Sequence, residues 1–294
     1  MKPPPFAYYD PKTVAEVVDL LGRLDNAKLL AGGQSLMPML NMRFVFPDHL
    51  IDLNTVAGLS FIRQTDGALE IGAMTRQREL EFSDLVRGQC PLMHEAICQV
   101  GHRQTRNRGT IGGSLCHLDP AAELVAVATA VDATVRVAGP NGQRDIAFAD
   151  FPVAFMAPAI EPDEIVTAVR IPAWAPGHGF AFVEFARRHG DFAIVSAAAL
   201  LEAGADGKVS RAAVALGGMG VRPVRVAAIE RGLIGEVPSE PLLQSLCEQC
   251  RSLEAMDDIH APASYRQHLA VVMSQRALRA AHARLGGDHS ARLQ

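Results

Sequence analysis

The chain has 294 residues, of which 49% are hydrophobic, and its net charge is −4. This composition is typical of a globular protein with two or three subdomains. The sequence contains no basic block, so nucleic acid is not an expected partner. No apolar run approaches the roughly 18 residues that cross a bilayer, and the N-terminus has no apolar signal segment, so we expect no membrane span. Five cysteines without a disulfide-like spacing favour a cytoplasmic location.

The first 100 residues alternate short helical and strand patterns. Thr13 and Glu16 form a capping-box pattern that opens an amphipathic helix. The expected elements that follow are a strand and loop at 28–35, strands at 49–53, 59–63 and 68–72, and helices at 79–82 and 91–100. Asp66-Gly67 indicates a hairpin turn before the third of these strands.

The middle of the chain contains an apolar helix pattern at 121–131, with Asp119 as the expected N-cap and Pro120 at the first helical position. Strands are expected at 133–137, 146–148 and 164–171, and the segment 173–178 reads as a domain boundary. Three consecutive strands follow at 180–187, 193–201 and 208–216, then helices at 224–233, 242–253 and 264–285. The pattern predicts an α+β protein with a C-terminal three-stranded sheet and a helical layer.

Two glycine-rich segments of similar character lie far apart in the chain. Ala31-Gly32-Gly33-Gln34-Ser35 follows a short apolar run, and Thr110-Ile111-Gly112-Gly113-Ser114 precedes the apolar helix. Glycines allow a backbone to approach a ligand closely, and successive N–H groups form anion-binding concavities. Two such segments indicate a ligand with two phosphates. Neither matches a known nucleotide fingerprint, and each taken alone is also typical of a simple tight connection.

The segments AGGQSLMPMLNMR (31–43) and RNRGTIGGSLCHLDPAAEL (106–124) resemble the FAD-binding (medium) subunits of the molybdenum hydroxylases, the xanthine oxidase and carbon monoxide dehydrogenase family. The resemblance extends over nearly the whole chain. It implies a PCMH-type FAD-binding domain at 1–176, with subdomains at about 1–55 and 56–176. A C-terminal domain like that of the carbon monoxide dehydrogenase flavoprotein would follow at 177–294.

The resemblance also implies which residues bind FAD. Both glycine segments would supply donors to the diphosphate. The implied cofactor-binding residues are Lys28, Leu29, Ala31, Gly32, Gly33, Gln34, Ser35, Leu36, Thr110, Ile111, Gly112, Gly113, Ser114, His117, Asp119, Glu123, Val166 and Phe192.

Several of these residues have a purely structural alternative. Glu123 aligns with an aspartate of xanthine oxidase near the FAD ribose, but an acidic residue is also favoured at a helix start. Asp119 is expected first as a helix cap. His117 is within the range of flavin or phosphate by resemblance, but a lone histidine in a loop is more often an ordinary hydrogen-bonding residue. Phe192 either shields the flavin ring or fills a core.

The remaining polar motifs give weaker signals. The arginine-rich stretch 103–108 is expected as a loop, and for Arg106 and Arg108 a solvated position and a contact with the diphosphate or a partner remain equally open. Cys247 and Cys250 form a solitary C-x-x-C pair, so no metal site is expected. No arrangement of catalytic acids and bases stands out.

The predicted function is an electron-transfer flavoprotein subunit without catalytic residues of its own. By resemblance, a small subunit would carry two [2Fe-2S] clusters and a large subunit the molybdenum cofactor, in a heterotrimer that pairs into a dimer of heterotrimers. Electrons would pass through the clusters to FAD and on to an external acceptor. A self-contained flavin oxidase is the alternative, and a non-enzymatic binding module is a third. Substrate and final acceptor remain open.

Overall fold

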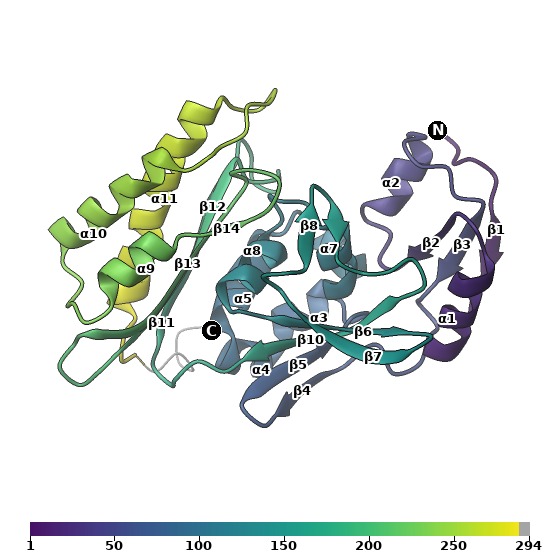
Figure 1. The fold of residues 1–294 in the computed structure, drawn as a ribbon, viewed down its shortest axis with the longest axis horizontal. Coiled ribbons are helices and arrows are strands. Elements are labelled where there is room, and N and C mark those ends of the chain that lie inside the picture. Colours follow the sequence, from purple (N-terminus) through teal and green to yellow (C-terminus); the bar gives the residue numbers. More distant parts are fainter. Residues whose placement is uncertain (288–294) are drawn as a thin grey trace.

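A computed structural model describes residues 1–287, in which three groups of elements follow one another along the long axis (Figure 1). The N-terminal group lies at one end, a central group of helices and strands follows, and the C-terminal sheet and helices form the other end. Residues 288–294, the end of the expected C-terminal domain, lie outside the described part.

The N-terminal group is a small parallel sheet with two helices. Its strands are β1 (Ala7–Tyr9), β2 (Ala27–Leu30) and β3 (His49–Asp52), in the order β1-β3-β2. Its helices are α1 (Val14–Arg23) and α2 (Leu36–Asn41). Thr13 caps α1 as the sequence predicts, because its side chain accepts a hydrogen bond of 3.2 Å from the Glu16 N–H.

The central group packs helices against a five-stranded antiparallel sheet of order β4-β5-β10-β6-β7. Its strands are β4 (Ile62–Thr65), β5 (Ala68–Gly72), β6 (Thr134–Gly139), β7 (Gly142–Ala147) and β10 (Ile165–Pro172), and a separate pair joins β8 (Pro152–Ala154) to β9 (Ala157–Pro158). Its helices are α3 (Gln77–Phe82), α4 (Asp84–Gln89), α5 (Pro91–Gln99), α6 (Arg103–Arg108), α7 (Ile111–His117) and α8 (Glu123–Ala130).

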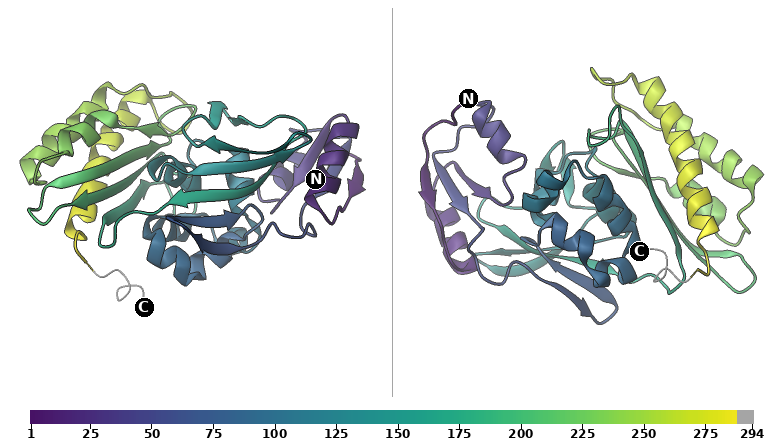
Figure 2. Two further views of the ribbon diagram at one scale, coloured as in Figure 1. Left: turned by 60° about the horizontal axis from the view of Figure 1, so that its bottom comes forward. Right: turned by 180° about the vertical axis from the view of Figure 1, so that it is seen from behind.

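The C-terminal group is an antiparallel sheet covered on both faces. Its strands are β11 (Gly179–Phe185), β12 (Val195–Ala203), β13 (Val209–Gly217) and β14 (Val224–Arg225). The long helix α11 (Ala263–Ala283) crosses one face, with α9 (Ala227–Leu233), α10 (Glu240–Glu248) and the 3-10 turn η1 (Gln249–Ser252) beside it. The opposite face packs on α5 and α8, so this sheet joins the central group (Figure 2).

The α+β class is confirmed, and several local predictions need correction. The sheet gains β14, because Val224 and Arg225 pair with β13 before α9 begins at Ala227. The arginine-rich stretch expected as a loop is the short helix α6.

The start of the apolar helix also differs from the prediction. Its N-cap is Ala122, not Asp119, and the helix begins at Glu123. The Asp119 carboxylate instead accepts a hydrogen bond from the Ala121 N–H at 2.9 Å, in the connection between α7 and α8. Leu118 just before it adopts the left-handed conformation, with φ of 54°, and ends α7.

Candidate functional site

The two glycine segments lie directly against each other. A Cβ atom added at Gly32 would stand 2.2 Å from the Arg108 carbonyl oxygen, just before the second segment. A Cβ atom at Gly113 would stand 3.3 Å from the Cβ of Ala31. Glycine at position 32 is therefore what lets the two backbones approach each other.

The second segment is the first turn of a helix rather than an open loop. Thr110 is the N-cap of α7, and its hydroxyl accepts a hydrogen bond of 3.0 Å from the Gly113 N–H. The N–H groups of Ile111 and Gly112 donate to the carbonyls of Thr75 and Ala73, at 3.2 and 2.8 Å. All early N–H groups of α7 therefore have partners within the protein, since Ser114 donates to Thr110.

The backbone N–H groups of the first glycine segment, unlike those of the second, have no partner within the described part of the protein. Within residues 1–287 no hydrogen bond uses the N–H groups of Gly32, Gly33, Gln34 or Ser35 as donors. Gly33 has a positive φ of 74°, which turns the chain into α2, and Ser35 caps that helix without a side-chain bond. These unpartnered N–H groups give the 32–35 backbone the donors that an anion needs.

Two polar side chains connect the glycine segments. Asn54, which follows β3, donates to the Ala31 carbonyl at 3.1 Å. Arg76, the N-cap residue of α3, donates to the carbonyl of Arg108 and to the side chain of Asn54. Burial is the main factor that lowers the pKa of Arg76, and the nearby Arg108 adds to it. Sequence analysis missed both residues, and neither stands in a recognisable motif.

The two arginines left open by the sequence have different environments. The Arg106 side chain is only 12% exposed and forms an ion pair of 2.9 Å with Glu81. Burial alone would raise the pKa of Glu81, but hydrogen bonds from Arg106 and Arg78 lower it overall. Arg108 is exposed, and its guanidinium forms no ion pair or hydrogen bond in the described part of the chain. Arg106 is thus structural, whereas Arg108 has a free, exposed guanidinium and contacts Gly32 through its backbone carbonyl.

Four of the predicted cofactor-binding residues lie outside the two glycine segments and have different environments. Lys28 is exposed on β2, and Leu29 beside it packs on the N-terminal core. His117 ends α7, and burial lowers its pKa. Glu123 is only 4% exposed at the start of α8, and burial raises its pKa to about 8.

The last two predicted residues have opposite exposure. Val166 is 4% exposed in the central core on β10. Phe192 is 58% exposed, in the connection between β11 and β12, so it does not fill a core in this chain. An exposed aromatic ring remains available to cover a ligand.

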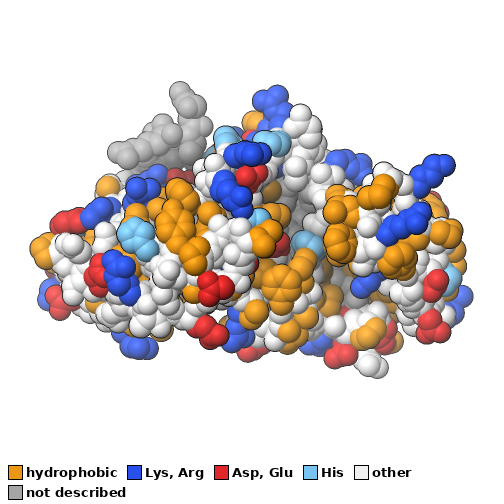
Figure 3. All heavy atoms as spheres, turned by 90° about the horizontal axis from the view of Figure 1, so that it is seen from above, with side chains coloured by type: hydrophobic (Ala, Val, Ile, Leu, Met, Phe, Trp, Pro, Cys, Tyr) orange, Lys and Arg blue, Asp and Glu red, His pale blue; other side chains and the backbone are white. Residues whose placement is uncertain are grey.

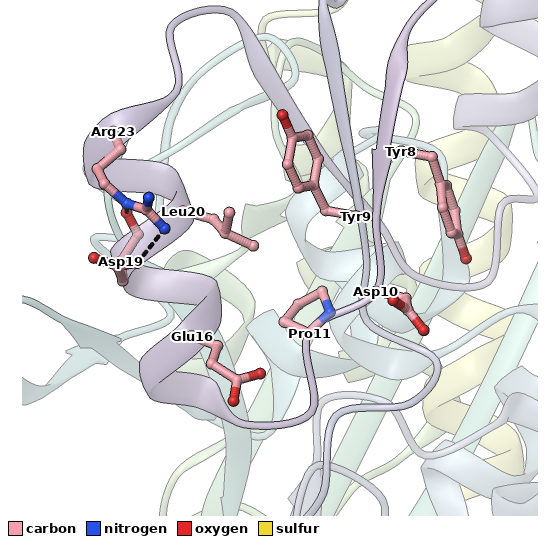
Figure 4. Close-up of a pocket in the computed structure, with 8 residues that line it drawn as sticks. All are labelled: Tyr8, Tyr9, Asp10, Pro11, Glu16, Asp19, Leu20 and Arg23. Atoms are coloured by element: carbon pink, nitrogen blue, oxygen red, sulfur yellow. Dashed lines mark hydrogen bonds and ion pairs between the residues drawn. The ribbon is translucent and has the colours of Figure 1, made fainter.

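Other parts of the molecule offer fewer site features. Figure 4 shows a surface cavity between β1 and α1, lined by residues such as Tyr9, Glu16 and Arg23, that contains no glycine-segment residue. No group of three or more metal-binding side chains occurs within residues 1–287, and all five cysteines are free. None of the described helices is both long enough and apolar enough to span a bilayer.

Comparison with known proteins identifies this architecture as that of a flavoprotein. Residues 4–174 match the family described as the FAD binding domain in molybdopterin dehydrogenase. Residues 180–281 match the carbon monoxide dehydrogenase flavoprotein C-terminal domain.

Individual relatives match over almost their whole length. The carbon monoxide dehydrogenase medium chain of Hydrogenophaga pseudoflava is 36% identical, over 97% of this chain and 99% of the relative. Subunit alpha of the 6-hydroxypseudooxynicotine dehydrogenase complex of Paenarthrobacter nicotinovorans is 39% identical, over 95% of both chains. The solved carbon monoxide dehydrogenase of H. pseudoflava superimposes with a TM-score of 0.94 at 38% identity, over 97% of this chain and 100% of the other. The chain belongs to the FAD-binding medium subunits of the molybdenum hydroxylases, which are oxidoreductases.

The junction of the glycine segments fits an FAD diphosphate. The N–H groups of residues 32–35 are available as donors, and Arg108, whose backbone contacts Gly32, has an exposed guanidinium without a partner in the described part of the chain. The lack of a side chain at Gly32 and Gly113 lets the two segments pack against each other at this place. Viewed from above, the surface is hollowed between the lobe that carries α2 and the centre of the molecule (Figure 3).

Proposed function

We propose that this chain is the FAD-carrying electron-transfer subunit of a heterotrimeric molybdenum hydroxylase. The observation that carries the proposal is the junction of the two glycine segments, of which the first has unpartnered N–H groups. The family matches at 4–174 and 180–281 support it. When bound, FAD accepts electrons from one donor and passes them to another, while the protein binds and orients it.

The residues of the first glycine segment bind the diphosphate directly in this proposal. The N–H groups at 32–35 and the free Arg108 side chain surround the negative charge. The second segment acts mainly by position, because the N–H groups of α7 are already used by Thr75, Ala73 and Thr110. The positive end of α7 still favours an anion near it. Thr110 and Ile111 would thereby help to shape the site without donating from their backbone.

The proposed domain boundaries are those that the family resemblance implies. We propose an FAD-binding domain at 1–176, with subdomains at about 1–55 and 56–176, and a C-terminal domain at 177–294. The family matches at 4–174 and 180–281 support the division into two domains. The two glycine segments come from different subdomains, so FAD would bind between them.

The expected partners are a small subunit with two [2Fe-2S] clusters and a large subunit with the molybdenum cofactor. Solved structures of carbon monoxide dehydrogenase and quinoline 2-oxidoreductase each contain a chain that matches 97% and 96% of this one. The lack of a metal-binding cluster within residues 1–287 supports separate chains for these centres. We extend the proposal to a dimer of heterotrimers and, because all five cysteines are free, to the cytoplasm.

Purification from the native host with a tag on this chain tests the proposal. We expect two further subunits to accompany it, with molybdenum, iron and FAD in the purified complex. A chain that purifies alone and whose flavin is reduced directly by an organic substrate would instead support the self-contained oxidase.

A further inference from the structure

Three segments meet at the end of the C-terminal sheet where β11 is joined to β12. In the β11–β12 connection, a Cβ atom at Gly190 would stand 2.5 Å from Cε1 of His102, the residue before α6. The rings of His102 and His189 lie 6.5 Å apart between their centroids. Arg187 of the same connection donates a hydrogen bond to the ring of His260, which precedes α11. These contacts bring the start of α6 together with two parts of the C-terminal domain.

The exposed side chains of the three segments are mainly basic. They form a loop surface, which consists of His102, Arg103, Arg187, Arg188, His189, Ile259 and His260. Within residues 1–287 none of its three arginines forms an ion pair, and the hydrogen bond of Arg187 goes to an imidazole rather than to a carboxylate. This positive surface contrasts with the net charge of −4 of the whole chain.

The neighbouring carboxylates leave most of this charge uncompensated. Three acidic residues lie within two positions of the loop surface in the sequence: Asp191, Asp257 and Asp258. Asp258 forms an ion pair of 2.7 Å with Arg266, and Asp257 accepts a hydrogen bond of 2.8 Å from the Ala263 N–H at the start of α11. Asp191 is therefore the one of the three that has no other partner, against three arginines.

Large exposed hydrophobic side chains gather in other places. Phe44 and Phe46, between α2 and β3, are 69% and 59% exposed, and Val153 and Phe155 at the β8–β9 pair are 63% and 56% exposed. Figure 3 shows hydrophobic side chains on the lobe that carries α2. The loop surface has one large apolar side chain, Ile259. Permanent subunit interfaces are rich in apolar area, whereas short-lived contacts are more polar, so the loop surface suits a partner that binds and leaves.

The loop surface also lies close to the glycine junction. Helix α6 begins at Arg103 on the loop surface and ends at Arg108, whose carbonyl oxygen contacts Gly32. A helix of this length spans only about 9 Å. A protein bound to the loop surface would therefore lie near the proposed cofactor site.

We propose that the loop surface docks an acidic electron-carrier protein, which is the external acceptor of this flavoprotein. The inference rests on the proposed function, in which electrons leave FAD for an acceptor outside the complex. Opposite charges speed the encounter of two proteins and fix their orientation. Neither described cavity includes a residue of the loop surface, which favours a protein over an enclosed small acceptor. A one-electron carrier would take the two electrons of reduced FAD in two encounters, with release of two protons.

The test uses the complex purified from the native host and two c-type cytochromes, one acidic and one basic, as probes of opposite surface charge. Binding of each oxidised cytochrome is measured by calorimetry at low and high ionic strength. The complex is then reduced with stoichiometric dithionite, and the rate of haem reduction is followed. We expect the acidic cytochrome to bind and to be reduced at least about tenfold faster than the basic one at low salt, with the difference lost at high salt.

Arg103→Glu and Arg188→Glu reverse one free charge in each domain. Each should weaken binding of the acidic cytochrome by about tenfold at low salt and slow its reduction by a similar factor. The melting temperature and the FAD content of the complex should stay the same, because neither side chain has a partner in the described part of the chain.

Lys208→Glu is the matched control. Lys208 is also exposed and without an ion pair within residues 1–287, but it lies between β12 and β13, at the opposite end of the sheet. The nine residues of β12 separate the two ends by about 30 Å. This variant changes the net charge by the same amount and should change binding and rate by less than about twofold.

The outcomes separate this inference from the proposed function. A complex without FAD contradicts the proposed function and the inference together. A complex that contains FAD but binds the two cytochromes equally, or binds neither, contradicts the inference alone. Equal effects of Arg188→Glu and Lys208→Glu would also overturn it, because net charge and not the loop surface would then matter. Loss of a subunit from the Arg188→Glu complex would show that the loop surface belongs to a permanent interface instead.

Discussion

Gly32 and Arg108 are in such close contact that a Cβ atom at position 32 would stand 2.2 Å from the Arg108 carbonyl oxygen. This contact joins the N-terminal sheet to the helix that begins after Thr110. The same carbonyl accepts a hydrogen bond from Arg76, which is bonded in turn to Asn54. The diphosphate site proposed above depends on this junction.

Gly32→Ala should separate the two glycine segments, because neither backbone can move away without breaking the hydrogen bonds of Arg76 to the Arg108 carbonyl and to Asn54. We expect a loss of about 1–3 kcal/mol in the free energy of unfolding and at least a tenfold loss of FAD affinity. Urea denaturation and FAD titration measure the two effects.

Gly22→Ala is the matched control for this substitution. Gly22 lies in α1 with no atom within 4 Å of an added Cβ, so alanine should stabilise the chain by about 0.5–1 kcal/mol. If Gly32→Ala behaves like Gly22→Ala, the contact with Arg108 does not constrain the site.

Arg106 and Arg108 should respond oppositely to replacement by glutamine. Arg106→Gln removes one of the two arginines that pair with the largely buried Glu81, leaves Arg78 as its partner, and should cost about 2 kcal/mol of stability. Arg108→Gln removes a free surface charge and should change stability by less than about 0.5 kcal/mol, while FAD binding weakens. Thermal unfolding and FAD titration of both variants test whether Arg106 is structural and Arg108 binds FAD. A destabilised Arg108→Gln together with an Arg106→Gln variant of unchanged stability would contradict these roles.

The N-cap of α7 gives a third prediction. Thr110→Ala removes the acceptor of the Gly113 N–H and should lower the free energy of unfolding by about 1 kcal/mol. Thr110→Ser keeps the hydroxyl and should retain most of that stability. Denaturant midpoints of the two variants provide the measurement, and equal losses would mean that the hydroxyl is not the cap.

The stability of the ligand-free chain should fall as pH rises between about 5 and 8. Burial raises the pKa of Glu123 from 4.5 to about 8, so in this range the folded state holds a proton that the unfolded state releases. The contribution is on the order of 3 kcal/mol, at up to about 1.4 kcal/mol for each pH unit. The raised pKa of Glu184 acts in the same direction.

Glu123→Gln tests this explanation, because glutamine does not titrate. The difference in free energy of unfolding between variant and wild type should shift in favour of the variant as pH rises. A difference that stays constant from pH 5 to pH 8 would show that Glu123 does not titrate in this range.

The meeting of the two glycine segments is the part of the site that sequence analysis predicted best. Their shared character and order, together with the family resemblance, predict that 31–35 and 110–114 belong to one site, and the structure places the two segments in contact. Their different hydrogen bonding was not predictable. The acceptors of the Ile111 and Gly112 N–H groups are carbonyls of Thr75 and Ala73, distant in sequence and set only by folding.

The pairing of Glu184 on β11 with Ser196 on β12 was not predictable for a related reason. An alternating strand pattern shows that both side chains belong to strands, but it does not give the register between β11, β12 and β13. That register alone brings the two residues together opposite Glu123. The start of α8 was misplaced because Asp119-Pro120 fits a helix cap locally, whereas the left-handed Leu118 directs the chain through a further turn.

The most direct test of the account is an equilibrium titration of the full-length wild-type chain with FAD, followed by quenching of flavin fluorescence. The account predicts saturable binding of one FAD per chain, weakened by Arg108→Gln and at least tenfold weaker in Gly32→Ala. The absence of saturable binding by the folded wild-type chain would contradict the proposal that the two glycine segments hold the cofactor.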